Sequence, residues 1–146
     1  MGERTMKLFQ AAGLAVILCI ALSHCATAGR GMYIYYPELA DRVLSGDATA
    51  FRRVLELSQT ILPGEKREEL ALISSKFVVV NPHSFLTEQS DSPDCFGVDF
   101  MGIEFVDNPT AKLAERSKRV SALSGVHQKS LESTKRACLA ILGGPP

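Results

Sequence analysis

Acidic side chains gather in the stretch 81–107, which contains no lysine or arginine. Carboxylates at suitable spacing can bind calcium or catalyse glycoside hydrolysis. The spacing here does not match an EF-hand loop, and the glycine of that loop is missing. The stretch therefore predicts a solvated acidic surface, with a small enzyme acting on cell-wall material as the alternative. The carboxylates are Glu88, Asp91, Asp94, Asp99, Glu104 and Asp107.

Cysteine is the second residue type that could do chemistry. Of the 4 cysteines, Cys19 and Cys25 lie in the apolar N-terminal stretch, which leaves Cys95 and Cys138. An isolated pair in an exported chain of this size most simply forms a structural disulfide. The pair lacks the Cys-x-x-Cys spacing of redox catalysts, so a Cys-based redox sensor is the alternative.

Histidine gives no comparable signal. None of His24, His83 and His127 belongs to a His-x-x-x-His or Cys/His cluster. Such clusters supply the ligands of zinc and of related metals. The sequence therefore predicts no metal site and no cofactor, with His83 and His127 as surface residues.

The three tyrosines of the chain, Tyr33, Tyr35 and Tyr36, fall within five residues of one another. Tyrosine is enriched at binding hot spots because it offers contact area and a hydroxyl at low entropy cost. The cluster is therefore the candidate binding site. The alternative is an N-terminal arm that folds onto its own helices.

Charge patterning argues for a protein partner and against nucleic acid. The chain carries 16 basic and 16 acidic residues, so no overall field attracts it to phosphate. The segment 112–136 is basic but lacks the interleaved aromatics that stack on bases. It either neutralises the acidic stretch within the fold or faces a partner. Its basic residues are Lys112, Arg116, Lys118, Arg119, Lys129, Lys135 and Arg136.

The N-terminal residues have the pattern of a secretory signal peptide. Arg4 and Lys7 precede the uncharged run Leu8–Leu22, and Ala26-Thr27-Ala28 offers small residues for cleavage before Gly29. Residues 1–28 are therefore expected to be removed, and the protein to be periplasmic or secreted. A lipoprotein anchored through Cys25 and an uncleaved membrane anchor are the alternatives.

Caps and prolines predict where the helices begin. Asp47, Asn81 and Asn108 suit N-cap positions, and Pro37 suits the first turn of a helix. The expected helices cover 37–45, 48–62, 65–80, 82–89, 109–124 and 127–142, with Pro63-Gly64 as a turn. The β-branched run at 78–80 could instead be extended.

Apolar periodicity within these helices predicts which side chains face the core. The stripes comprise Phe51, Val54, Leu55, Ile61, Leu62, Leu70, Ile73, Phe77, Val80, Leu113, Val120, Leu123, Leu131, Thr134, Cys138 and Ile141. Cys138 thus lies on a buried stripe. Residues 90–107 show no helical period and predict a small hairpin or a loop packed down by Phe96, Phe100 and Phe105.

Together these features predict a mainly α protein. It would be a compact helical bundle, arranged as an irregular bundle or as two stacked helix pairs, with a disulfide-tethered loop or hairpin around 90–107. Residues 29–146 would form a single domain. We expect an exported, non-enzymatic module that binds another protein, such as an inhibitor, an immunity-type protein or an envelope accessory protein. No nucleic acid and no stable membrane insertion after cleavage are expected, and a homo-oligomer is compatible with the sequence.

Overall fold

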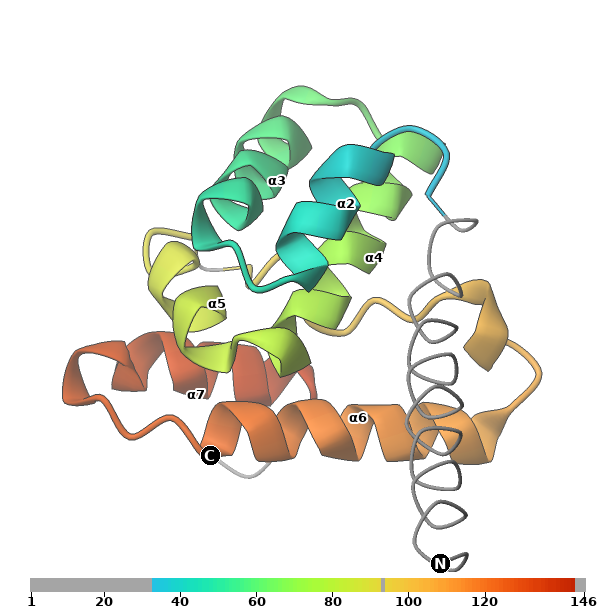
Figure 1. The fold of residues 1–146 in the computed structure, drawn as a ribbon. Helices are drawn as coiled ribbons and strands as arrows, with labels where there is room; N and C mark the ends of the chain where they lie inside the picture. The colour runs from blue at the N-terminus through green and yellow to red at the C-terminus, as the bar shows by residue number, and fades with distance from the viewer. Residues whose placement is uncertain (1–32, 93, 144–146) are drawn as a thin grey trace, which may run out of the picture. The chain divides into compact units, whose positions relative to one another are not determined.

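Helices are the only regular elements in the part of the chain that the computed structural model describes, residues 33–92 and 94–143. In Figure 1, α2, α3 and α5 gather around α4, and α6 and α7 lie together below them. This is the compact helical bundle that the sequence predicts. The elements are α2 (Pro37–Leu44), α3 (Ala48–Thr60), α4 (Glu65–Val80), α5 (Pro82–Glu88), the 3₁₀ turn η1 (Ile103–Phe105), α6 (Pro109–Ser124), the 3₁₀ turn η2 (Lys129–Leu131) and α7 (Glu132–Ile141).

The predicted starts of α2, α3, α4, α5 and α6 are confirmed, and capping side chains explain three of them. The carboxylate of Asp47 accepts a hydrogen bond from the backbone N–H of Ala50. Asn81 and Asn108 cap α5 and α6 in the same way. Each side chain satisfies a backbone donor that the first helical turn leaves free. The run at 78–80 is helical, not extended.

The core forms where α3, α4 and α5 meet. The ring of Phe51 stacks on that of Phe77, with 4.3 Å between the centroids, and lies 5.5 Å from that of Phe85. All three rings are fully buried. Aromatic pairs in such contacts stabilise a core by about 0.5–1.5 kcal/mol beyond the burial of their surface. The predicted inward positions Phe51 and Phe77 are therefore confirmed.

Four predicted core positions are instead exposed, and all lie toward helix ends. Leu62 is 84% exposed because α3 ends at Thr60, before the apolar period does. Leu113, near the start of α6, is 66% exposed. Val80 and Ile141 are the last residues of α4 and α7 and are also exposed. The apolar period of the sequence continues to these ends, but the side chains there are not covered by a neighbouring helix.

The segment after α5 forms a loop, so the hairpin alternative is wrong for its described residues. Its apolar contacts also differ from those expected, because Cys95 and Val98 are buried while Phe96, Phe100 and Phe105 are only half-buried. The disulfide between Cys95 and Cys138 is confirmed, and it ties the loop to α7 across 43 residues of sequence. On the chain-entropy model, closing a loop of that length stabilises the fold by about 4 kcal/mol.

The last predicted helix begins later than expected. Residues 127–128 are irregular, η2 covers Lys129–Leu131, and α7 starts only at Glu132. No helix in the described residues is long and apolar enough to cross a bilayer. The predicted signal peptide and its Cys25 alternative fall outside the described residues.

Candidate functional site

The three tyrosines differ in their surroundings. Tyr33 is only 7% exposed and packs into the core, so it does not contribute an exposed ring. Its burial, together with the negative charges of Glu104 and Glu69, raises the pKa of its hydroxyl. Tyr36 is half-buried against the core, whereas Tyr35 is 40% exposed. Of the predicted cluster, Tyr35 and Tyr36 are the members that reach the surface.

A buried carboxylate on α4 fixes the backbone of this tyrosine segment. The two oxygens of Glu69 accept hydrogen bonds from the backbone N–H groups of Ile34, Tyr35 and Tyr36, at 2.8–3.1 Å. Hydrogen bonds to a charged acceptor are shorter and stronger than neutral ones. Sequence reasoning missed this role, although Glu69 lies one turn before the inward residue Ile73 and so on a buried face.

Tyr35 and Tyr36 line a hollow of about 560 Å³ beside the turn between α3 and α4. The Tyr35 hydroxyl donates a 2.6 Å hydrogen bond to Glu65, and this bond is the main reason that its pKa is raised. The Lys66 ammonium lies 5.5 Å from the centroid of the Tyr35 ring. The hollow is lined by Tyr35, Tyr36, Ile61, Leu62, Pro63, Gly64, Glu65 and Lys66.

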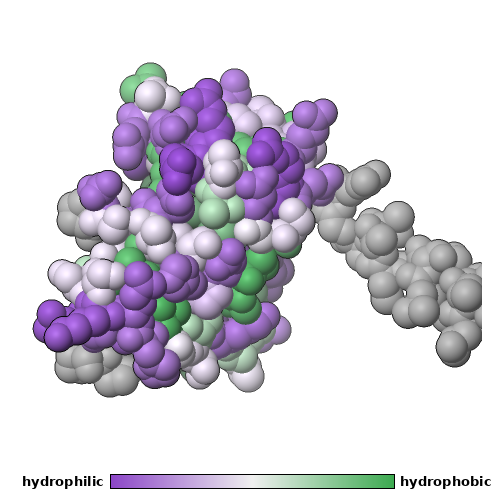
Figure 2. Space-filling model, turned by 60° about the vertical axis from the view of Figure 1, so that its left-hand side comes forward, coloured by the Kyte–Doolittle hydropathy of each residue, from purple (hydrophilic) through white to green (hydrophobic). Residues whose placement is uncertain are grey.

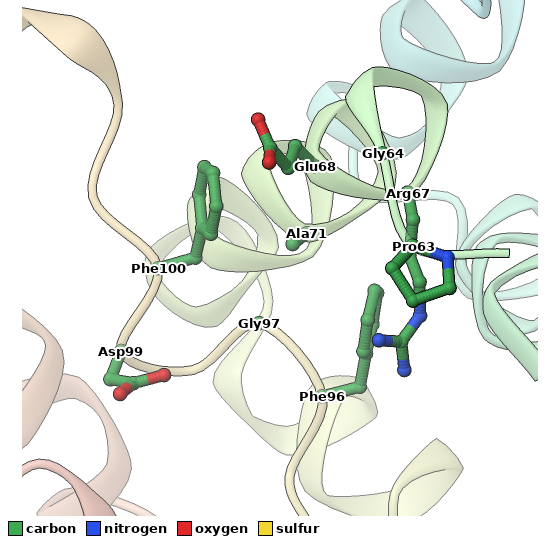
Figure 3. A pocket seen from close by; sticks show the side chains of 9 residues that line it. All are labelled: Pro63, Gly64, Arg67, Glu68, Ala71, Phe96, Gly97, Asp99 and Phe100. Carbon is green, nitrogen blue, oxygen red and sulfur yellow. The ribbon is translucent and has the colours of Figure 1, made fainter.

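A second hollow lies on the other side of the same turn and shares Pro63 and Gly64 with the first. Its volume is about 310 Å³. Figure 3 shows the Phe100 ring and the Glu68 and Asp99 carboxylates on one side and Phe96 with Arg67 on the other. The lining residues are Pro63, Gly64, Arg67, Glu68, Ala71, Phe96, Gly97, Asp99 and Phe100. We call the two hollows and the turn between them the Pro63 corner.

Buried polar side chains hold the loop that forms one wall of the second hollow. The amide of Gln89 accepts from the backbone N–H of Phe96 and donates to the Phe96 carbonyl, which Ser74 also reaches at 2.5 Å. Arg119, which is 0% exposed, donates to the carbonyls of Val98 and Phe100 at 2.9 and 2.7 Å. These hydrogen bonds fix the backbone conformation of the loop, whose Phe96 and Phe100 side chains line the hollow.

Gly97 allows this loop to lie directly on α4. Its φ of +76° is a left-handed conformation that favours glycine. A Cβ at this position would lie 2.7 Å from the Ala71 carbonyl oxygen and from the Ser74 Cβ. Any larger residue would have to push the loop away from the helix.

The acidic and basic segments are not joined by direct ion pairs among the described residues. Glu88 pairs with Arg52 on α3, and Glu104 pairs with Lys76 on α4. In the basic segment, Arg119 and Lys135 pair with carboxylates of their own helices. None of these four ion pairs joins the acidic segment directly to the basic segment.

Glu104 illustrates how these pairs affect titration. Burial alone would raise the pKa of its carboxyl. The hydrogen bond from Lys76 and the positive charges of Lys76 and Arg119 outweigh this effect, so that the pKa is lowered.

Neither of the two described histidines is among the residues that line the hollows. His83 and His127 are exposed, and a ring nitrogen of His83 contacts the side-chain oxygen of Gln128. Within the described residues, no group of three or more His, Cys, Asp or Glu side chains is placed to hold a metal ion.

Comparison with known proteins identifies no relative. No family model matches the chain, and neither a curated protein nor a solved structure matches it. A functional hypothesis must therefore be argued from the geometry of the Pro63 corner.

Proposed function

We propose that this protein is an exported, non-enzymatic module that binds another protein through the Pro63 corner. The observation that carries the proposal is the position of Leu62, which is 84% exposed on the turn between two hollows. Exposed apolar side chains beside polar-rimmed concavities are typical of protein contact sites. Inhibitor, immunity-type and envelope accessory proteins are the classes this small exported fold would suit.

Hydrogen bonds from buried side chains fix the backbone of the Pro63 corner, which favours recognition by a preformed site. Glu69 fixes the backbone at Tyr35, while Gln89 and Arg119 fix the loop that carries Phe96 and Phe100. A surface whose backbone is already ordered loses less entropy when a partner binds. Tyr35 adds an aromatic ring at the rim, and aromatic anchors account for much of the energy at protein interfaces.

One face of the described domain has a mixed apolar and polar exterior (Figure 2). Figure 2 shows hydrophobic patches lying between hydrophilic side chains on one face of the domain, as opposed to a uniformly charged exterior. Interfaces of non-obligate complexes combine apolar contact points with a polar rim in this way.

Binding can be tested with the mature chain and two matched leucine variants. Leu62→Asp places a charge at the Pro63 corner, and Leu113→Asp places one on an exposed leucine of α6. The partner is first identified by pull-down from envelope extract and mass spectrometry, and its dissociation constant is then measured with purified proteins. We expect Leu62→Asp to weaken binding by about 30-fold or more, which corresponds to roughly 2 kcal/mol.

The control defines the outcomes. Leu113→Asp should bind as the unmodified protein does, and both variants should keep the same helicity. Loss of binding in Leu113→Asp alone would place the interface on α6. Repeated absence of a stoichiometric partner would overturn the binding function itself.

Export is tested separately by intact mass. A chain that begins at Gly29 in the soluble envelope fraction supports the proposed cleavage. A diacylglycerol-modified terminus at Cys25 would instead make the protein membrane-tethered.

A further inference from the structure

The second hollow of the Pro63 corner is lined by two carboxylates that lack a direct partner among the described residues. Glu68 and Asp99 both line the hollow, and neither has a hydrogen bond or ion pair with a described residue. The remaining charge in the lining is the guanidinium of Arg67. The hollow therefore has an excess of negative charge.

Arg67 is engaged within the protein. Its Nε donates a 3.1 Å hydrogen bond to the Ser58 carbonyl, and its guanidinium carbon lies 5.3 Å from the centroid of the Phe96 ring. These contacts hold it on the Phe96 side of the hollow, apart from Glu68 and Asp99 in Figure 3. Its contact with Phe96 also shows that a ring of this hollow attracts a guanidinium group.

Phe100 lies on the opposite side, between Glu68, toward which its ring points, and Asp99, its neighbour in the chain (Figure 3). The face of a phenyl ring carries partial negative charge, so it attracts a cation as the carboxylates do. Rings and carboxylates together favour a long cationic side chain, whose methylene groups contact the rings while its charged end meets the carboxylates.

The size of the hollow restricts the occupant further. Its volume of about 310 Å³ is at the lower end of the range of roughly 300–1,000 Å³ found for small-molecule sites. This room suits one side chain better than an extended ligand. The backbone at Gly97 lies directly against Ala71 and limits its depth.

We propose that this hollow receives a lysine or arginine side chain of the protein partner, with the charged end near Glu68 and Asp99. The proposal rests on the protein-binding function and adds to it the chemistry of one contact. An anion is disfavoured because it would meet two carboxylates and a single arginine already hydrogen-bonded elsewhere.

The site can be tested without knowing the partner. ¹⁵N-labelled protein is titrated with N-acetyl-arginine N-methylamide, and chemical-shift changes are followed by NMR. N-acetyl-citrulline N-methylamide, which lacks the charge, and N-acetyl-aspartate N-methylamide, which reverses it, are the matched probes. We expect saturable shifts for the arginine probe at residues 67–71 and 96–100, with at least fivefold weaker binding of the other two.

Two variants and one control test the named carboxylates. Glu68→Gln and Asp99→Asn should each weaken binding of the arginine probe at least threefold. Added salt should weaken its binding further by screening. Asp107→Asn, which removes an exposed carboxylate outside the hollow, should leave it unchanged. Equal binding of the citrulline probe, stronger binding of the aspartate probe, or shifts centred elsewhere would overturn the proposal.

Partner binding separates this proposal from the function on which it rests. If Leu62→Asp weakens partner binding and Asp99→Asn does not, the protein-binding function stands, and the proposal that a basic side chain of the partner enters the hollow is wrong. If the arginine probe binds as expected but no partner exists, the cation site stands and the protein-binding function fails.

Discussion

The side chain of Gln89 hydrogen-bonds both backbone groups of Phe96, with distances of 3.0 Å to the carbonyl and 3.2 Å from the N–H. Gln89 is fully buried at the end of α5, seven residues before its partner. One amide thus replaces the pairing that a neighbouring strand would give, and it holds the loop of the Pro63 corner in place.

Gln89→Leu should therefore destabilise the domain although the two side chains have a similar volume. The substitution leaves the Phe96 N–H without its partner, and an unsatisfied buried polar group costs about 1–3 kcal/mol. Urea denaturation measures the free energy of unfolding. Gln59→Leu, on the exposed side of α3, should change it by less than about 0.5 kcal/mol.

Arg119→Met should have a larger effect. It removes the donor to Val98 and Phe100 and leaves the Glu115 carboxylate, which Arg119 contacts at 3.0 Å, without its cation. Breaking one side of a buried ion pair costs about 3–5 kcal/mol. Arg136→Met, at an exposed position of α7, is the control. Equal stability of the two variants would show that Arg119 does not hold the loop.

Gly97→Ala and Gly143→Ala separate backbone strain from steric overlap. Both glycines have positive φ, +76° and +67°, but only Gly97 has protein atoms within 4 Å of an added Cβ. Left-handed backbone costs a non-glycine residue about 1–2 kcal/mol at either site. We expect Gly97→Ala to lower the free energy of unfolding by a further amount of about 1 kcal/mol or more, which is the typical cost of overpacking. Thermal denaturation of both variants gives the difference.

Cys138→Ser should lower the free energy of unfolding by about 2–5 kcal/mol, because the disulfide no longer restricts the unfolded chain. Alkylation of the denatured, unreduced protein should label neither Cys95 nor Cys138. Labelling of both in the native, purified protein would instead support a thiol-based sensor.

The Glu104–Lys76 pair should make stability depend on acid pH. The pKa of Glu104 is lowered from its ordinary value of 4.5, so the unfolded chain binds a proton more readily than the folded one. The contribution is present above pH 4.5 and is lost as the pH falls through the lower folded pKa. Glu104→Gln should flatten the decline of the urea midpoint below that pH.

Local signals in the sequence predicted most of the fold. Asp47, Asn81 and Asn108 mark helix starts because a cap acts on residues only a few positions away. The disulfide could be predicted because the other two cysteines, Cys19 and Cys25, fall in the predicted signal peptide. The signals failed at helix ends, where the exposure of Leu62 depends on which surface lies opposite.

The candidate site was much less predictable. Glu69, Gln89 and Arg119 are polar residues whose buried partners lie elsewhere in the chain, and apolar periodicity does not detect them. The predicted tyrosine cluster includes Tyr35, which lines one hollow of the Pro63 corner. The placement of Phe96 beside α4 could not be predicted, because it depends on contacts between residues far apart in the sequence.

Helix α4 has buried side chains over most of its circumference, since a helix turns by about 100° per residue. These are Glu69, Leu70, Ala71, Ile73, Ser74, Ser75, Phe77 and Val78. The helix packs against α2, α3, α5 and α6, so removing any one neighbour exposes part of the common core. Partial unfolding should therefore expose apolar surface at a cost that the gain in chain entropy does not offset. We expect the domain to unfold in one cooperative transition. No fragment that ends before or begins after α4 should fold alone.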